Sequence, residues 1–246
     1  MHPRLVGLAL AIAVPSVGCQ VQRGSVAFVG CPADGQMGPI AAPIGEPRVA
    51  PLNDVSTGDI VYYKGERAPG VFAPAGWQCR VWYGSSGSTV LVTPTPVDTM
   101  EFLPPKVLGP AVEMTVLFAG SSGRFGVASY AARLFPTVLA SFIERIRNQH
   151  VVADSLFEPR RYVRDSVSSV DSVMTEFTTP SNATGLGTAG LLGPSNIPIQ
   201  GVAVIAPDPR EPDMSILRIR LDGSARRLEP AILRLNTDCM RKTDGC

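Results

Sequence analysis

The chain has 246 residues, with 22 basic and 21 acidic side chains. This near-neutral balance excludes the basic footprint that a nucleic-acid-binding protein needs, so no nucleic-acid partner is expected. The length is sufficient for a sizeable core in one large domain or two small ones. The 24 glycines and 23 prolines predict many turns and irregular connections.

Residues 1–18 have the pattern of a signal peptide. A short basic start at Met1–Arg4 precedes an apolar run over Leu5–Val14, and Ser16-Val17-Gly18 supplies the small residues that a signal peptidase reads. The apolar run is shorter than the about 20 residues that a membrane-spanning helix requires. We therefore expect an exported protein that is periplasmic, anchored to the cell envelope or secreted.

Cys19 follows this segment directly. Val17-Gly18-Cys19 resembles the end of a bacterial lipobox, although Ser16 stands where that pattern prefers leucine. Two fates stay open: Cys19 carries a lipid, or it is lost on cleavage. A lipid on Cys19 would be the one expected contact with a membrane.

Four cysteines remain without Cys19, and an even number in an oxidising compartment predicts two disulfides. Of the three possible pairings, the local ones are favoured: Cys31 with Cys79, and Cys239 with Cys246. A zinc site would need short paired spacings, and no CxxC occurs. No metal or cofactor is therefore expected.

The first half is predicted as three segments. Residues 19–50 form an irregular N-terminal arm, since Gly-Pro and Ala-Pro steps interrupt them. Residues 51–97 form a β-rich subdomain, with a strand at 59–63 and a hairpin joining 78–83 to 89–93 through Gly84-Ser-Ser-Gly87. Residues 98–110 are rich in proline and are interpreted as a linker.

Residues 111–246 are predicted as an α+β domain in which an antiparallel sheet is packed with two helices. The expected strands are 112–118, 172–179, 201–206 and 215–221. One helix is expected over 127–149, with a kink or a second start at Pro136, and another over 225–235. In the last strand Leu217 and Ile219 point to a buried face, whereas Arg218 and Arg220 point to a face that is wet or meets a partner.

Two stretches resemble exported bacterial proteins of unknown function. They are Gly70–Cys79 with Tyr83–Pro94, and Thr179–Thr188 with Pro198–Ala203. The resemblance implies bacterial export and carries no activity and no site residue.

A glycine motif and a histidine are the first candidates for chemistry. Gly185, Gly187 and Gly190 match GxGxxG, but Gly193-Pro194 follows too soon for the helix that a dinucleotide site needs, so a flexible loop is predicted. His150 has Asp154 and Ser155 nearby in sequence and is interpreted as a helix-end residue. No GxSxG nucleophile elbow occurs.

Charged clusters give weaker signals. Asp208, Glu211 and Asp213 are interpreted as a solvated hairpin loop rather than a calcium site, because prolines and Arg210 interrupt them. Two arginine groups are interpreted as solvated faces, with an anionic envelope partner as the alternative: Arg160, Arg161 and Arg164, and Arg218, Arg220, Arg226 and Arg227. Asn182-Ala-Thr184 matches a glycosylation acceptor, which matters only on a eukaryotic route.

These observations favour a non-enzymatic protein that acts by binding or structural interaction with an unknown envelope protein or ligand. The alternative is an exported hydrolase with a serine- or carboxylate-based site in the C-terminal half. A polar cleft lined by His150 or by paired carboxylates would favour the hydrolase, and an apolar groove would favour binding.

Overall fold

The computed structural model describes residues 23–52, 55–97, 106–158, 161–206, 208 and 210–242. This part of the chain contains 13 strands and three α-helices, so the fold is mixed α+β and mostly sheet. The predicted signal peptide and Cys19 lie outside the described residues. Cys246 also lies outside them, so the pairing of Cys239 with Cys246 stays a prediction.

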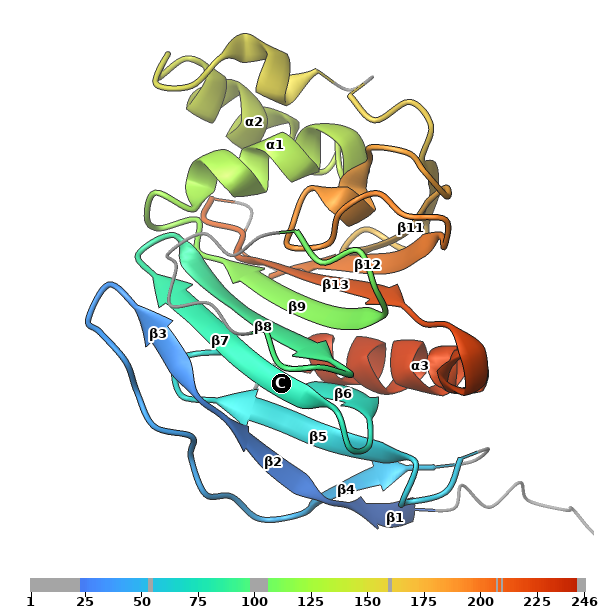
Figure 1. The fold of residues 1–246 in the computed structure, drawn as a ribbon. Coiled ribbons are helices and arrows are strands. Elements are labelled where there is room, and N and C mark those ends of the chain that lie inside the picture. The colour runs from blue at the N-terminus through green and yellow to red at the C-terminus, as the bar shows by residue number, and fades with distance from the viewer. Residues whose placement is uncertain are drawn as a thin grey trace, which may run out of the picture.

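One sheet of eight strands organises the molecule (Figure 1). Its order is β10-β11-β12-β13-β9-β8-β7-β3, and every neighbouring pair is antiparallel except β3 with β7. The strands are β3 (Ala33–Gly35), β7 (Gln78–Gly84), β8 (Gly87–Thr93), β9 (Ala111–Leu117), β10 (Ser166–Ser169), β11 (Met174–Thr179), β12 (Ile199–Ile205) and β13 (Met214–Arg220). The predicted hairpin is confirmed, because Gly84 pairs with Gly87 at its tip.

The N-terminal segment is not the irregular arm that the sequence predicts. It forms β1 (Arg23–Val26), β2 (Phe28–Cys31) and β4 (Arg48–Pro51) in addition to β3. β1 pairs with β4, and β2 pairs in parallel with β5 (Ile60–Gly65), whose other neighbour is β6 (Val71–Pro74). These strands escape sequence analysis because each is short and its pairing partner is distant in the chain.

The proline-rich segment does not separate two sheets. β8 ends before it and β9 begins after it, yet the two strands pair in register from Gly87 with Leu117 to Val92 with Val112. The predicted β-rich subdomain and α+β domain therefore share one sheet. Residues 98–105 of the predicted linker lie outside the described part.

Two helices lie on one face of the large sheet, at the top of Figure 1. α1 (Arg124–Leu134) and α2 (Ala140–Arg147) flank Pro136, so the proline separates two helices rather than kinking one. The 3-10 helix η1 (Asp154–Phe157) packs beside them. Their apolar side chains form a core with Ala203, Ile205 and Ile216 of the sheet.

The other face carries α3 (Glu229–Met240) and the smaller β2-β5-β6 sheet. α3 follows the 3-10 helix η3 (Gly223–Leu228). The buried Asn236 fastens α3 to the edge of β6, because its Oδ1 accepts from the Phe72 amide at 2.8 Å and its Nδ2 donates to the Phe72 carbonyl at 2.9 Å. The side-chain amide thus satisfies the outer edge of β6, where the described part of the chain places no further strand.

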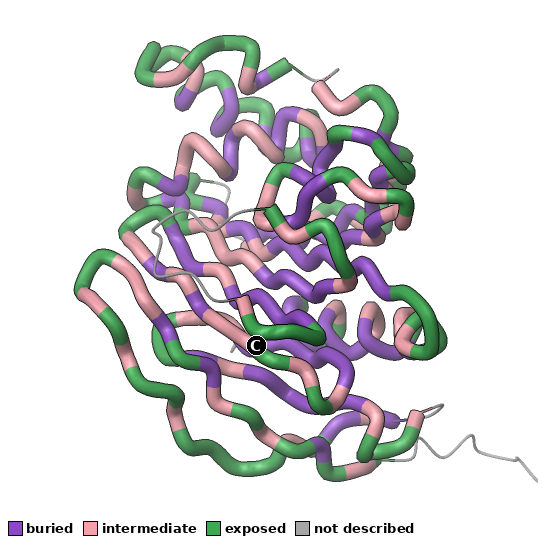
Figure 2. Tube along the Cα trace, viewed as in Figure 1, coloured by how far each residue is buried: buried purple, intermediate pink, exposed green. Residues whose placement is uncertain are grey.

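Layers on both faces leave the large sheet mostly buried, and exposed residues follow the N-terminal connections (Figure 2). Met114 and Leu217 point to the core under α3, whereas Ile216 points to the core under α1. Successive residues of a strand alternate between faces, so both sets of β13 side chains are covered.

Candidate functional site

An open groove of about 970 Å³ lies on the α3 face of the large sheet, beside the C-terminal end of that helix. Part of its floor is a row of side chains that lie opposite one another in neighbouring strands: Ser88 of β8, Val116 of β9, Ser215 of β13 and Val204 of β12. Opposite residues in an antiparallel pair share a face, so this row forms one surface. α3 ends at Met240 and leaves the groove open.

The rim of the groove is basic. Lys64 and Arg67 come from β5 and the turn that follows it, and Arg241 and Lys242 follow α3. Asp213 is the one acidic side chain among the described lining residues. Its Oδ1 accepts from the Ala119 amide at 2.8 Å, so this carboxylate already has a structural partner. The lining therefore carries a net positive charge.

The four basic side chains differ in their surroundings. Arg241 is paired with Asp171 at 2.8 Å between Nη1 and Oδ2. The Arg67 guanidinium lies 5.5 Å from the centre of the Tyr83 ring and donates to the Met37 sulfur at 3.3 Å. Neither the Met37 thioether nor the Tyr83 ring is negatively charged, so the Arg67 guanidinium has no counter-ion among the described residues. Lys242 is exposed at the rim.

Burial lowers the pKa of Lys64 from its ordinary 10.5, and the positive charge of Arg48 lowers it further. Both causes act against the ammonium form. An anion bound at this end of the groove would favour the ammonium form of Lys64. The groove is therefore a place where positive charge is concentrated next to apolar surface.

Apolar side chains cover most of the remaining lining. Met114, Val116 and Val204 belong to the sheet, and Val173 and Phe118 lie at the ends of β11 and β9. Phe118 is among the large apolar residues that remain exposed. A concave site with apolar walls and a few polar groups is the usual form of a small-molecule site.

Ser88 is the unusual polar group of the floor. It is 5% exposed, and its Oγ has no hydrogen-bond partner in the described structure. A buried hydroxyl without a partner loses its hydration and gains nothing in return, which costs about 1–3 kcal/mol. Native proteins rarely leave a buried hydroxyl without a hydrogen-bond partner, so the unpaired Ser88 hydroxyl in the groove needs an explanation.

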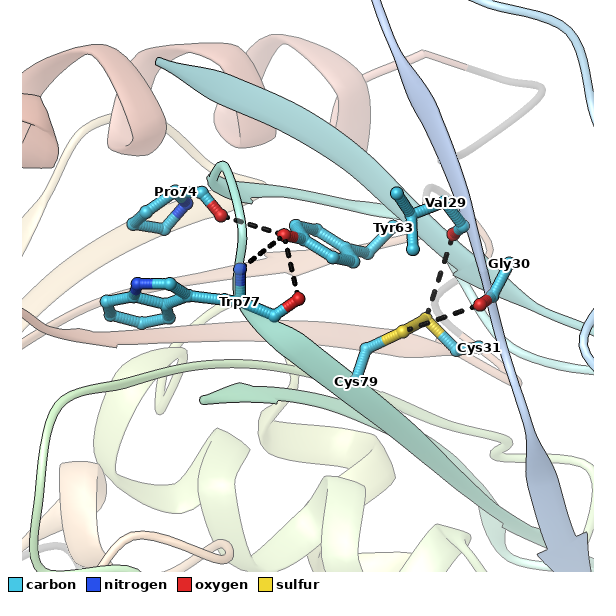
Figure 3. The surroundings of a disulfide bond; sticks show 7 residues. All are labelled: Val29, Gly30, Cys31, Tyr63, Pro74, Trp77 and Cys79. Atoms are coloured by element: carbon cyan, nitrogen blue, oxygen red, sulfur yellow. Dashed lines mark hydrogen bonds between the residues drawn. A yellow bond between two sulfur atoms is a disulfide. The ribbon is translucent and has the colours of Figure 1, made fainter. Parts of the chain in front are cut away.

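A disulfide joins the small sheet to the large sheet (Figure 3). The sulfur atoms of Cys31 and Cys79 lie 2.06 Å apart, as the sequence predicts for this pair, and they join β2 of the small sheet to β7 of the large one. The residues are 48 apart in sequence, so the crosslink removes roughly 4 kcal/mol of loop entropy from the unfolded chain. β5 and β7, which supply Lys64 and Tyr83, are thereby held together.

Tyr63 strengthens the same junction (Figure 3). Its hydroxyl donates to the Pro74 carbonyl at 2.8 Å and accepts from the Trp77 amide at 3.1 Å. Burial raises the pKa of Tyr63 to about 12, so the phenol stays protonated and keeps both bonds. The connection between β6 and β7 is therefore anchored from within the core.

The glycine-rich loop is not the flexible segment that the sequence predicts. Gly185–Thr188 are all buried, and residues 186–188 form the 3-10 helix η2 (Leu186–Thr188). A Cβ added at Gly190 would lie 2.0 Å from Oε1 of Glu113, and one at Gly185 would lie 2.1 Å from Oδ1 of Asp165. The glycines are needed because the loop backbone packs directly onto these two carboxylates.

Both carboxylates bind the loop through its amides. Oδ2 of Asp165 accepts from Leu186 N at 2.6 Å, and Oε2 of Glu113 accepts from Leu191 N at 2.8 Å. No local pattern singles out Glu113 or Asp165, because the loop residues that they bind are at least 20 positions away.

Arg218 and Arg220 are buried, so the prediction of a wet or partner-facing arginine face is wrong. Arg218 donates to Leu186 O at 3.0 Å, to Glu113 Oε1 at 2.8 Å and to the Tyr130 hydroxyl at 2.7 Å. Arg220 donates to the carbonyls of Gly109, Gly193 and Val107. The two side chains hold the glycine-rich loop and the start of β9 over the sheet, which explains why the loop is ordered.

The remaining candidates do not come together. His150 is exposed after α2 with φ of 52°, and within the described chain its imidazole makes no hydrogen bond to Asp154 or Ser155. Asp208 and Glu211 are exposed, as expected for a solvated loop, but Asp213 reaches the groove. No group of three or more His, Cys, Asp or Glu with metal-binding geometry occurs among the described residues.

The other arginines are mostly on the surface. Arg164 and Arg226 are exposed, Arg227 pairs with Asp59 at 3.0 Å, and Arg161 donates to the Ser129 hydroxyl at 2.9 Å. Arg160 lies outside the described residues. Across the described ranges, no helix has the length and apolar character that crossing a bilayer requires.

Comparison with known proteins identifies no relative: no family model, curated protein or solved structure matches the chain.

Proposed function

We propose that this protein is an exported, non-enzymatic binding protein whose groove takes a single-chain amphiphile with an anionic head. The observation that carries the proposal is the pairing of four basic rim residues with an apolar floor in one open groove. Positive charge at the rim complements an anionic head, and the floor offers surface to an apolar chain.

The groove favours an amphiphile over a purely ionic ligand. A small inorganic anion would engage the rim alone and leave Val116 and Phe118 partly in water. A neutral alkyl chain would cover the floor but leave Arg67 without a counter-ion among the described residues. A ligand that has both parts satisfies both surfaces, and burial of apolar area contributes about 25 cal/mol per Å².

The test is a calorimetric titration of the mature protein with dodecyl phosphate, dodecyltrimethylammonium and inorganic phosphate, each below its aggregation threshold. We expect dodecyl phosphate to bind, and the cationic amphiphile and phosphate alone to bind much more weakly. The R67E/K242E variant should bind dodecyl phosphate about tenfold more weakly, because two attractive rim charges become repulsive.

The matched control is Arg164→Glu, which reverses an exposed arginine in the segment before β10, away from the groove lining. It should leave the affinity unchanged. Equal binding of the cationic and anionic amphiphiles, an equal effect of R164E, or no binding of dodecyl phosphate would overturn the proposal.

A further inference from the structure

We propose that Ser88 and Arg67 bind the anionic head of the ligand, and that its chain runs from β8 across β9 and β13 to β12. This inference rests on the proposed function and adds the direction in which the ligand lies. It assigns a role to the buried Ser88 hydroxyl, which has no hydrogen-bond partner among the described residues.

The Ser88 hydroxyl is available to a ligand in the groove. Its side chain is more than nine-tenths buried, it lines the groove, and its Oγ neither donates to nor accepts from any described group. A hydroxyl offers one donor and two acceptor sites. A phosphate or carboxylate oxygen in the groove would supply the missing acceptor for its proton, and hydrogen bonds to ionised groups are the strong ones.

Arg67 lies at the same end of the groove. Its guanidinium stacks over the Tyr83 ring, and Tyr83 is the residue directly opposite Ser88 in the β7–β8 pair. An arginine presents a planar fork of donors that suits phosphate and carboxylate oxygens. One neutral hydroxyl and one cation thus converge on the β7–β8 side of the floor.

The opposite end offers a weaker place for the head. Arg241 is already paired with Asp171 at 2.8 Å and also contacts the Met174 sulfur. Asp213, directly before β13, adds a negative charge to the lining that would repel an anion. Because the Ser88 hydroxyl and Arg67 lie together at the other end, we place the head over β7 and β8.

The apolar path starts next to Ser88. Val116 is its cross-strand neighbour, Ser215 follows on β13, and Val204 on β12 is at the far end. Neighbouring strands lie about 4.8 Å apart, so the floor from Ser88 to Val204 covers three strand spacings, or roughly 14 Å. An extended alkyl chain can lie along this row.

Two substitutions of the same kind on the same row test the position of the head. Ser88→Ala should weaken binding of dodecyl phosphate about tenfold, the effect of losing one charge-assisted hydrogen bond. Ser215→Ala should change it less than about twofold, because that hydroxyl faces the chain rather than the head. The same order is expected with dodecanoate, which presents a carboxylate instead of a phosphate.

Stability distinguishes a binding role of Ser88 from a structural one. Removal of a buried hydroxyl without a partner should leave the free energy of unfolding unchanged or raise it. Loss of affinity in S88A together with an unchanged or higher urea midpoint supports the proposal. A structural hydroxyl would instead lower the midpoint.

The far end is tested with Val204→Phe, at the last residue of the row, and a series of octyl, dodecyl and hexadecyl phosphate. The bulky ring should leave octyl phosphate unaffected and weaken the longer ligands. Equal losses in S88A and S215A, no loss in S88A, or a uniform effect of V204F would overturn the direction while binding itself stands. If the unmodified protein binds no alkyl phosphate or carboxylate, both proposals fail.

Discussion

Glu113 and Arg218 form an ion pair beneath the glycine-rich loop, with Oε1 and Nη1 2.8 Å apart and both side chains at most 1% exposed. Both partners make further hydrogen bonds: Arg218 donates to Leu186 O and to the Tyr130 hydroxyl, and Glu113 accepts from Leu191 N. It ties β9, β13, α1 and the loop into one network.

Removing either partner of this pair should be strongly destabilising. Glu113→Gln leaves a buried guanidinium without its counter-ion, and Arg218→Met leaves a buried carboxylate, so each should lower the free energy of unfolding by about 3–5 kcal/mol. The double variant should lose less than the sum. Urea unfolding of all four proteins measures the coupling. The exposed pair of Asp59 with Arg227 is the control, and Asp59→Asn should have a much smaller effect. Additive single losses would contradict the network.

Arg220 should control the order of the loop ends. Its guanidinium donates hydrogen bonds to three carbonyls, and a lysine ammonium cannot reach all three in the same geometry. We expect Arg220→Lys to lose about 2 kcal/mol of stability. Hydrogen exchange of the Val107 and Gly193 amides should accelerate, since these bond to Leu191 O and Val107 O in the segment that Arg220 holds. Unchanged exchange there would show that the loop is held by other contacts.

The disulfide between Cys31 and Cys79 should contribute roughly 4 kcal/mol through the unfolded chain. The C31S/C79S variant is therefore expected to unfold at a clearly lower urea concentration than the oxidised protein. Any further response of that variant to reductant would come from the other cysteines. Intact mass of the natively expressed protein adds the cleavage site, the state of Cys19 and the number of disulfides. A variant as stable as the oxidised protein would exclude a stabilising role for this bond.

Ionisation of Asp165 should weaken the fold. Burial raises its pKa above the ordinary 3.8, although the Leu186 amide, the Thr179 hydroxyl and Arg133 act in the opposite direction. A raised pKa means that the folded protein binds the proton more tightly than the unfolded chain. The free energy of unfolding should therefore fall as the pH rises from about 4 through the folded pKa, and stay level above it.

Asp165→Asn should flatten that part of the pH profile, measured by urea unfolding between about pH 3.5 and 7. The other shifted carboxyl groups are the same in both proteins, so the difference between the two profiles reports Asp165. Asp154→Asn changes an exposed carboxylate and serves as the control. A D165N profile parallel to that of the unmodified protein would contradict this assignment.

Local features of the fold could be predicted from the sequence. The β7–β8 hairpin follows from two β-rich runs around Gly84–Gly87, and the break between α1 and α2 follows from Pro136. Both depend on residues close in the chain. The pairing of β2 with β5 and of β3 with β7 depends on partners about 30 to 50 positions apart, where no local pattern gives the register.

The arginines of β13 show how a correct pattern can lead to a wrong environment. Alternation correctly separates Leu217 and Ile219 from Arg218 and Arg220. Alternation does not show what covers Arg218 and Arg220. In the fold, carbonyls of the glycine-rich loop and the carboxylate of Glu113 on β9 lie over that side of β13. The same loop explains the literal GxGxxG match, because its glycines allow close backbone packing rather than a phosphate contact.

The groove was not predictable for a similar reason. Its rim combines residues 64–67 with residues 241–242, and its floor combines Ser88 with Ser215. In sequence, Ser88 is one of several serines after a turn and carries no signal of its own. Only the assembled sheet shows that its hydroxyl is buried in the groove.

The floor row combines strands from both sides of the proline-rich segment: Ser88 precedes it, and Val116, Ser215 and Val204 follow it. A chain cut within residues 98–110 would yield two fragments, neither of which contains a whole groove. Because β8 and β9 pair along six residue pairs, the fragments have a ready interface through which to reassociate. Ligand capture would then report complementation between the two pieces, and the protein could serve as a split sensor.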